Sequence, residues 1–321
     1  MPGRRGSPGA TLVIGEALID VVRAPDGTST EHVGGSPLNV AVGLARLGHP
    51  VSLATHIGRD RHGAMIGEHL SEAGVGLVPH SDRAEDTPVA TATLDEQGQA
   101  EYDFDVSWRL PELSQRAGHL HTGSYGALMR PGGLDVLAAM NGGRRTGTVS
   151  YDPNIRPALV PDHDRALAEV ERRVALSDVV KASDADLEWL AGRPLDEDAL
   201  FGWLRTWQDL GPMLAVCTRG AHGALAVLPS GRQLSLPGTS VDVADTVGAG
   251  DSFMSGLLSG LLDAGLLGGP EARARLRRAR GRAVVPALQR GLDAAAVTVT
   301  RVGAQPPTRA DLGLPPQSAK R

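Results

Sequence analysis

A carboxylate ends a glycine-rich run toward the C-terminal end of this 321-residue chain. The run reads Asp245-Thr246-Val247-Gly248-Ala249-Gly250-Asp251, and an amphipathic stretch from Ser252 to Leu262 follows it. Glycines let a backbone approach a ligand closely, and the free N–H groups and positive dipole end of a helix start attract an anion. A carboxylate held there can act as a general base. From these residues alone, Asp251 could equally be an ordinary helix cap.

The other common phosphate-binding signatures are missing from the sequence. There is no Gly-x-x-x-x-Gly-Lys-Ser/Thr, and the chain has two lysines, Lys181 and Lys320, which excludes a lysine-cradled P-loop. No Gly-x-Gly-x-x-Gly follows an expected strand, so the usual dinucleotide-binding fold lacks its fingerprint. If phosphates bind, backbone amides such as those at Gly248, Ala249 and Gly250 must bind them.

Composition narrows the class of protein. A net charge of −5 gives no general attraction to nucleic acid or to an anionic membrane, so we expect neither as a partner. A single cysteine, Cys217, excludes an intrachain disulfide, and no Cys/His spacing resembles a zinc site. The apolar run from Ala10 to Ile14 is too short for a signal peptide or a membrane span. We therefore expect a cytoplasmic protein.

Short β-branched runs alternate with longer amphipathic stretches along most of the chain. This rhythm predicts an α/β fold with a mostly parallel central sheet and helices on both faces. We expect a single domain over residues 10–304, with loose tails at residues 1–9 and 305–321 that are rich in Gly, Pro and Arg. The expected strands are Thr11–Gly15, Val51–Thr55, Thr148–Asp152, Val179–Ala182, Leu214–Thr218 and its hairpin partner Ala224–Val227, and the expected helices are Ser36–Leu47, His62–Ala73 and Ser252–Leu262.

Two segments and one charge cluster depart from this rhythm. Residues Val21–Val33 and Pro88–Phe104 alternate in polarity around turn signals at Pro25-Asp26-Gly27 and Asp95-Glu96-Gln97-Gly98. They predict a small β lid, with strands within residues 21–33 and 88–108 and one solvated face. The arginine-rich run Arg273–Arg282 is interpreted as a solvated helical face, and a nucleotide or partner role is its alternative.

Two motifs near opposite ends of the chain resemble those of the ribokinase-like, or PfkB, carbohydrate kinases. The family's C-terminal signature, Asp-Thr-x-Gly-Ala-Gly-Asp-x-Phe, matches Asp245–Phe253 at every defined position. Its N-terminal signature matches Gly34-Gly35-Ser36-Pro37-Leu38-Asn39-Val40-Ala41, followed by Leu44-Ala45-Arg46-Leu47-Gly48. The resemblance spans Leu12 to Ala304. It implies a three-layer α/β/α fold and ATP-dependent phosphorylation of a sugar hydroxyl, with Asp251 as base and residues 248–251 as anion hole.

The same resemblance implies a sugar site. It assigns the sugar hydroxyls to Asp20, Gly34, Gly35 and Asn39, and a carboxylate and an amide are suited to vicinal hydroxyls. The segment from Ser150 to Pro157 is similar to one in fructokinases and ketodeoxygluconate kinases, and places Arg156 toward the sugar or the transferring phosphate. A structural turn is the alternative for that segment.

Nucleotide and cation sites are implied as well. Thr218, Gly220 and Gly223 match a turn beside the ATP phosphates, close to Gly250, and the stretch from Ala287 to Ala296 is expected to form the adenine wall. Asp152 and Asp186 would position Mg²⁺ through water, although Ser183 and Asp186 replace the family's Asn-x-x-Glu with a shorter carboxylate. Asp245, Val247 and the backbone of Gly303 match positions that hold a monovalent cation, so K⁺ is an expected activator.

The sugar is less sharply indicated. Asp103 and Asp105, if they face the cleft, would repel an acidic sugar and favour a neutral ketohexose such as fructose. Arg109 and Arg156 are carboxylate partners that keep 2-keto-3-deoxygluconate as an alternative, beside other pentose, hexose or nucleoside substrates. A catalytically weak sugar-binding regulator is the non-enzymatic alternative. Family members often pair through such lids, which implies a homodimer.

Overall fold

The computed structural model describes residues 10–95, 100–113, 117–160 and 162–317. Within them, a nine-stranded sheet has the order β13-β12-β11-β10-β9-β8-β1-β4-β5. From β11 to β5 all neighbouring strands are parallel, and β12 and β13 add an antiparallel edge. The strands are β1 (Thr11–Ile14), β4 (Val51–Ala54), β5 (Gly76–Leu77), β8 (His119–Gly123), β9 (Thr148–Asp152), β10 (Val179–Ser183), β11 (Leu214–Thr218), β12 (Ala224–Val227) and β13 (Gln233–Leu236).

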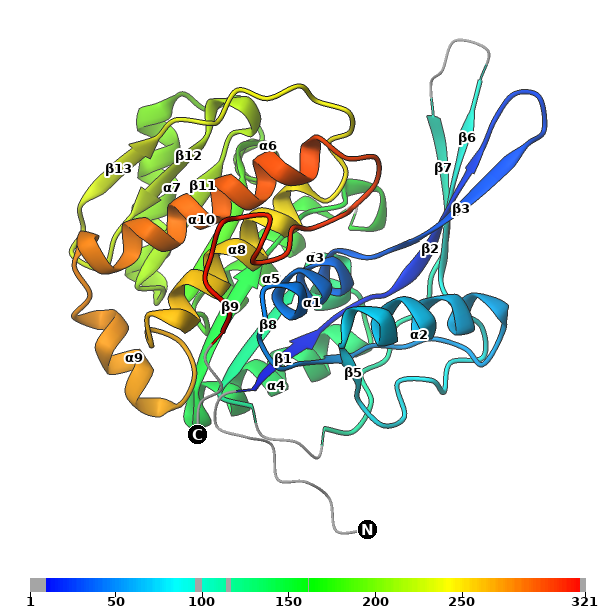
Figure 1. The fold of residues 1–321 in the computed structure, drawn as a ribbon, viewed down its shortest axis with the longest axis horizontal. Coiled ribbons are helices and arrows are strands. Elements are labelled where there is room, and N and C mark those ends of the chain that lie inside the picture. The colour runs from blue at the N-terminus through cyan, green and yellow to red at the C-terminus, as the bar shows by residue number, and fades with distance from the viewer. Residues whose placement is uncertain (1–9, 96–99, 114–116, 161, 318–321) are drawn as a thin grey trace.

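Helices cover both faces of this sheet, which confirms the predicted three-layer arrangement (Figure 1). One face carries α1 (Ser36–Arg46), α2 (Arg61–Ala73), α8 (Ala249–Asp263), α9 (Pro270–Arg277) and α10 (Gly281–Val299). The other carries α3 (Ser124–Leu128), α4 (Gly132–Thr146), α5 (His163–Val174), α6 (Asp184–Ala191) and α7 (Glu197–Leu210). Side chains of β1 alternate between the two cores, Val13 in one and Leu12 and Ile14 in the other. No helix of the described residues is long and apolar enough to cross a bilayer.

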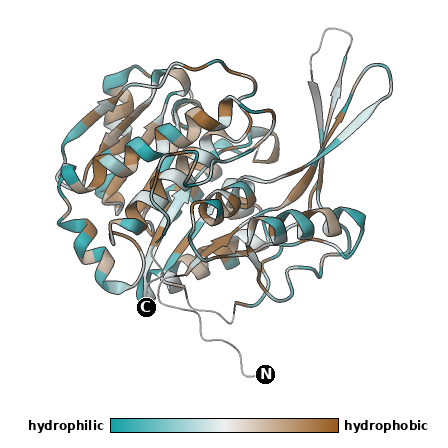
Figure 2. Ribbon diagram, in the orientation of Figure 1, coloured by the Kyte–Doolittle hydropathy of each residue, from teal (hydrophilic) through white to brown (hydrophobic). Residues whose placement is uncertain are grey.

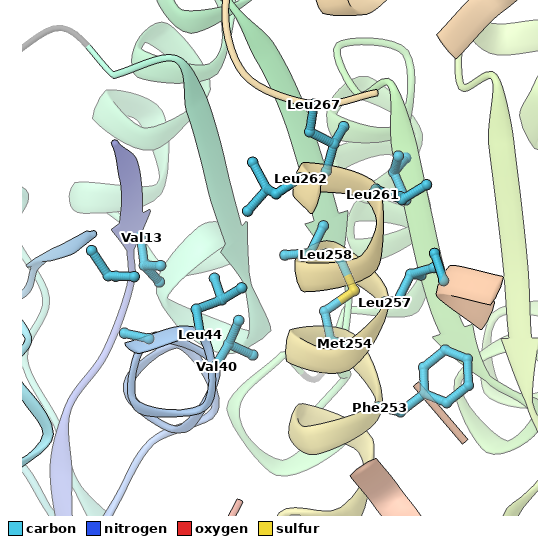
Figure 3. Close-up of a cluster of buried hydrophobic side chains, with 14 of the residues drawn as sticks. Val13, Val40, Leu44, Phe253, Met254, Leu257, Leu258, Leu261, Leu262 and Leu267 are labelled. Carbon is cyan, nitrogen blue, oxygen red and sulfur yellow. The ribbon is translucent and has the colours of Figure 1, made fainter. Parts of the chain in front are cut away.

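Helix α8 is held on several sides by the first of these cores. Met254, Leu257 and Leu258 are fully buried, and Leu258 lies on the side of α8 toward Leu44 of α1 while Leu257 points to the opposite side (Figure 3). Helix α10 packs closely, because a Cβ atom on Gly260 would lie 2.5 Å from the Cα atom of Ala287. A helix enclosed in this way cannot shift without leaving voids, so its N-terminus has a fixed position.

A four-stranded sheet projects from the body as the predicted lid (Figure 1). Its order is β3-β2-β6-β7, formed by β2 (Leu18–Arg23), β3 (Ser29–Gly34), β6 (Val89–Leu94) and β7 (Ala100–Asp105). Apolar residues gather near its base and hydrophilic ones toward its outer part (Figure 2). Most of the second expected turn, residues 96–98, lies outside the described residues. The lid is therefore apolar where it meets the body.

Residues 305–317 differ from the loose tail predicted for residues 305–321. Pro306 and Pro307 are buried, and Arg309 donates 3.1 Å hydrogen bonds to the Leu47 carbonyl and to Asp263. Gln317 lies 3.1 Å from a ring nitrogen of His49. Polar anchors and prolines hold this segment without any apolar periodicity, which is why its composition suggested a tail. Residues 1–9 and 318–321 lie outside the described residues.

The arginine run is largely a solvated surface, as interpreted. Arg277, Arg278 and Arg280 are exposed. Arg273 is the exception, because its guanidinium contacts both oxygens of the buried Asp178 at 2.7 and 3.0 Å. Asp178 immediately precedes β10, so this ion pair fixes the start of that strand.

Candidate active site

Asp251 lies in the first turn of α8 with 8% of its surface exposed. Its Oδ1 accepts a 2.6 Å hydrogen bond from the Ser36 hydroxyl, and its Oδ2 accepts a 2.8 Å bond from the Asn39 amide. Ser36 and Asn39 are three residues apart on α1 and so share one face of that helix. The residue that caps α8 is Gly248, without a side-chain cap. The carboxylate therefore faces α1 instead of capping its own helix, and the two sequence motifs meet at it.

The loop before Asp251 offers free amide donors. Gly248 has a φ of 74°, a conformation that suits glycine, and a Cβ atom there would lie 2.6 Å from that of Ala304. Within the described part of the chain, the N–H groups of Gly250 and Asp251 donate to no acceptor. Together with the positive end of the α8 dipole, these amides form a site for an anion.

A cavity of about 360 Å³ opens in front of Asp251. It brings together many of the residues that the sequence predicted, namely Asp20, Gly35, Asn39, Arg156, Val247, Gly248, Gly250 and Asp251. Gly34 lies beside the cavity, and a Cβ atom on it would be 2.1 Å from the Asp20 carboxylate. Glycine at position 34 thus leaves room for the Asp20 side chain.

The charges around this cavity are mixed. Burial raises the pKa of Glu16 to about 7, although Glu16 accepts a 3.0 Å hydrogen bond from the Gly126 amide. Burial also raises the pKa of Asp20, against the opposing effect of the Arg156 guanidinium. Arg156 is oriented by a 2.7 Å bond to the Asn154 side chain. The cavity can therefore offer acceptors and donors to a polyhydroxylated ligand.

Strand β7 of the lid contributes an apolar side chain and no charge to this cavity, whereas Asp20 of the lid strand β2 lines it. Asp103 and Asp105 are exposed and lie outside its lining, whereas Phe104 between them lines it. Alternation along β7 accounts for this, since successive side chains point to opposite faces. The β7 carboxylates therefore do not face the cleft, and Arg109 does not line it either. The acidic groups that do line it are Glu16, Asp20 and Asp251, together with the apolar side chains of Leu18, Ala90, Phe104, Tyr125 and Leu159.

A second cavity of about 570 Å³ lies on the other side of the glycine loop. Thr218, Gly220 and Gly223, the residues predicted to lie beside the ATP phosphates, line it together with Ala249 and Gly250. Its apolar wall is formed by Val241, Val243, Leu292, Ala295, Ala296 and Val299. The expected wall from Ala287 to Ala296 thus overlaps the C-terminal half of α10. Because Gly250 lines both cavities, the loop is their common border.

Asp152 and Asp186 lie close behind the cavities but line neither. Asp186 forms a capping box with Ser183, and its other oxygen accepts a 2.7 Å bond from the Ile155 amide. Asp152 accepts a 2.7 Å bond from the Lys181 ammonium, and its Oδ1 is buried without a partner among the described residues. Burial raises the pKa of Asp152 to about 6, and burial of Lys181 is outweighed by the nearby carboxylates, which raise its pKa. The 2.7 Å contact is an ion pair in which each charge favours the other.

The residues expected to hold a monovalent cation also lie together. The Asp245 carboxylate accepts a 3.0 Å bond from the Val247 amide and a 2.8 Å bond from the Gly303 amide. These amide bonds lower the pKa of Asp245. An ionised carboxylate beside two loops is a suitable setting for a hard cation.

Ser36, Glu16 and Lys181 are among the polar residues of the first cavity that were not predicted. Ser36 stood inside the N-terminal motif without a role, although its spacing of three from Asn39 places both on one helical face. Glu16 follows β1 at the carboxyl edge of the sheet, where α/β folds place ligands. Lys181 interrupts an apolar strand, and this is the signal that could have singled it out.

Comparison with known proteins agrees with this geometry. The family model for pfkB family carbohydrate kinases matches residues 10–311. A fructokinase from Rhizobium leguminosarum bv. trifolii is 35% identical over 264 residues, which cover 78% of this chain and 79% of that protein. A crystal structure of a fructokinase double mutant from Vibrio cholerae O395 with fructose, ADP and potassium superposes with a TM-score of 0.78 at 27% identity, covering 97% and 99% of the two chains. A second structure from that organism, with fructose, ADP and calcium, also has a TM-score of 0.78 at 27% identity and covers 96% and 99%.

Proposed function

Because this chain belongs to the pfkB family of carbohydrate kinases, we propose that it is a fructokinase, which transfers the γ-phosphoryl group of ATP to a hydroxyl of fructose. The similar proteins described above, two of them holding fructose and ADP, support this substrate pair. The observation that carries the proposal is the position of Asp251. Its carboxylate is fixed by Ser36 and Asn39 at the border of two cavities, beside amides with no other acceptor.

In this proposal the sugar occupies the smaller cavity and ATP the larger. Asp251 takes the proton of the attacking hydroxyl while the sugar oxygen forms a bond to the γ-phosphorus atom. The bond between that phosphorus and the bridging oxygen breaks, and its electron pair leaves with ADP. The amides of Gly250 and Asp251 stabilise the charge on the transferring group.

Two cations fit the residues present. Mg²⁺ usually binds through substrate phosphates and one or two carboxylates with several waters. The unpartnered Oδ1 of Asp152 suits a water of that shell, whereas both oxygens of Asp186 already accept hydrogen bonds from the protein. When bound, Mg²⁺ supplies charge neutralisation on the phosphates. Asp245, with backbone at Val247 and Gly303, is proposed to hold an activating K⁺.

The charges of the smaller cavity favour a neutral sugar. Asp20 and Asp251 would oppose a sugar carboxylate and Arg156 would attract one. The charge of Lys181, which also lines this cavity, is paired with Asp152. The position of the Arg156 guanidinium in the lining of this cavity favours 2-keto-3-deoxygluconate as the second candidate substrate.

Release of ADP measured over a panel of substrates tests the proposal. The panel contains fructose, other neutral hexoses and pentoses, 2-keto-3-deoxygluconate and nucleosides, each with Mg²⁺ and with or without K⁺. We expect the highest kcat/KM for fructose and faster turnover with K⁺. A higher kcat/KM for 2-keto-3-deoxygluconate than for fructose would show that the second candidate is the substrate. Absence of turnover on every compound would favour a sugar-binding regulator.

We also propose that the protein is cytoplasmic, without nucleic-acid or membrane partners, and that two copies pair through their lids. The lid has an outer strand on each side, β3 and β7, whose free edges could extend the sheet. Light scattering coupled to size exclusion measures the mass in solution. A mass equal to one chain at micromolar concentration would exclude the dimer.

A further inference from the structure

Lys181 is a buried cation in a chain that uses arginine for nearly all of its 32 basic residues. It lies in β10 between apolar neighbours, is 3% exposed, and lines the smaller cavity together with Asp251. The adjacent parallel strand β9 ends with Asp152, whose carboxylate lies 2.7 Å from the ammonium. The ion pair thus lies toward the carboxyl edge of the sheet, where α/β folds place their ligands.

The ammonium lies against the glycine loop. A Cβ atom on Gly250 would be 3.3 Å from Nζ of Lys181, closer than most such contacts in proteins. Gly250 lines both cavities, so the ammonium lies next to the border where the two ligands of a kinase must meet. Glycine at position 250 therefore serves two purposes: it exposes its amide and it leaves space for this cation.

The ammonium also has donors to spare. An ammonium has three N–H groups, and within the described ranges Lys181 forms one hydrogen bond, to Asp152. Its one ion pair within 4.0 Å among those residues is the same contact. A buried charge is costly unless its donors are satisfied, so the remaining donors favour an anionic ligand.

We propose that the Lys181 ammonium contacts the γ-phosphoryl group during transfer and that Asp152 positions it. This inference rests on the proposed kinase function. Lys181 keeps its proton throughout, while the sugar proton passes to Asp251 and the electron pair of the broken bond leaves with ADP. The ammonium and the amides of residues 250 and 251 would then neutralise the same group from two sides.

A lysine suits this position better than an arginine. An ammonium is a compact point charge, whereas a guanidinium is a wide planar fork. The space between Asp152 and Gly250 is limited by the contact described above. We therefore expect Lys181→Arg to restore little of the rate lost in Lys181→Met.

The test compares wild type, Lys181→Met and the double variant Lys181→Met/Asp152→Asn, which leaves no unpaired buried carboxylate. If the ammonium acts on the transferring group, kcat falls by about two orders of magnitude in both variants. Affinities for ADP and for the sugar, measured separately by calorimetry, should stay within about threefold of wild type. The tightening of ADP binding by aluminium fluoride in the presence of sugar should be lost, because this complex mimics the transferring group.

Arg273→Met is the matched control. It removes a cation–carboxylate pair, Arg273 with Asp178, at the opposite end of the same strand. It should lower thermal stability and leave kcat per folded molecule unchanged.

Recovery of kcat to within about tenfold of wild type in the double variant would overturn the proposal, since Lys181 would then merely neutralise Asp152. Retained aluminium fluoride tightening in the variants would overturn it as well. If the wild-type protein phosphorylated none of the sugars, the result would instead contradict the proposed function.

Discussion

At the scale of single residues, the chemistry depends on how one carboxylate is held. Asp251 is oriented by two donors from α1, so replacing its charge should separate binding from turnover. We expect Asp251→Asn to bind the sugar normally and to lose at least about two orders of magnitude in kcat. Steady-state ADP release and calorimetry measure the two effects.

Asp198→Asn is the control for this variant, because Asp198 also lies in the first turn of a helix, α7. Unlike Asp251, it is exposed. Its kcat should equal that of wild type. Turnover of Asp251→Asn within tenfold of the control would exclude Asp251 as the base.

Glu16 predicts a pH dependence of stability. Its pKa is raised by burial from 4.5 to about 7, so the folded state binds the proton more tightly than the unfolded state. The stability that this group contributes is complete below its ordinary pKa and is lost as the pH rises through about 7. Relative to Glu16→Gln, wild type should lose up to about 3 kcal/mol between about pH 5 and pH 8.

Chemical denaturation at several pH values measures that difference. Glu68→Gln, at an exposed position of α2, is the control and should follow wild type at every pH. Parallel curves for wild type and Glu16→Gln would show that Glu16 is not buried as a neutral acid.

At the scale of elements, Asp186 joins α6 to the segment after β9. Its carboxylate caps α6 with Ser183 and accepts the buried Ile155 amide. We expect Asp186→Ala to lower the free energy of unfolding by about 2 to 3 kcal/mol, because one cap and one buried amide lose their partner. Urea denaturation measures this loss, and Asp184→Ala in the same turn should cost about 0.5 kcal/mol. Equal losses in the two variants would argue against the capping role.

The elements that the sequence predicted are those with a local signal. Strand β1 is a short apolar run and helix α8 is a longer one that follows a glycine-rich loop, and the glycine motifs indicated the site near Asp251. Helix α10 was not predicted, and Pro286 lies in the first half of this helix, which continues to Val299. Lys181 could not be assigned, since its partner Asp152 lies on another strand and becomes a neighbour only through the sheet register. Long-range contacts of this kind leave no trace in local spacing.

At the scale of the whole molecule, the C-terminal segment closes the domain. Arg309 links the end of α1 to Asp263 at the end of α8, so residues 305–317 connect the two helices that hold the base in place. Removal of residues 305–321 should lower Tm by several degrees and reduce kcat together with it. Scanning calorimetry of this truncation measures the effect.

Removal of residues 318–321 alone is the control, and its Tm should match that of wild type. Arg309→Ala should reproduce part of the loss, because it breaks the hydrogen bonds of that side chain to the Leu47 and Pro315 carbonyls and to Asp263. If the protein without residues 305–321 had the same Tm as the full-length chain, the prediction that this segment is a loose tail would be correct.

The two hydrogen bonds on Asp251 also order events during protein synthesis. Ser36 and Asn39 leave the ribosome 215 and 212 residues before Asp251, and the helix α10 that packs against α8 follows later still. A nascent chain can fold its first strands and helices, but it has no oriented base until this late stage. Translation products that stop before Asp251 therefore carry Ser36 and Asn39 without the carboxylate that these two residues orient.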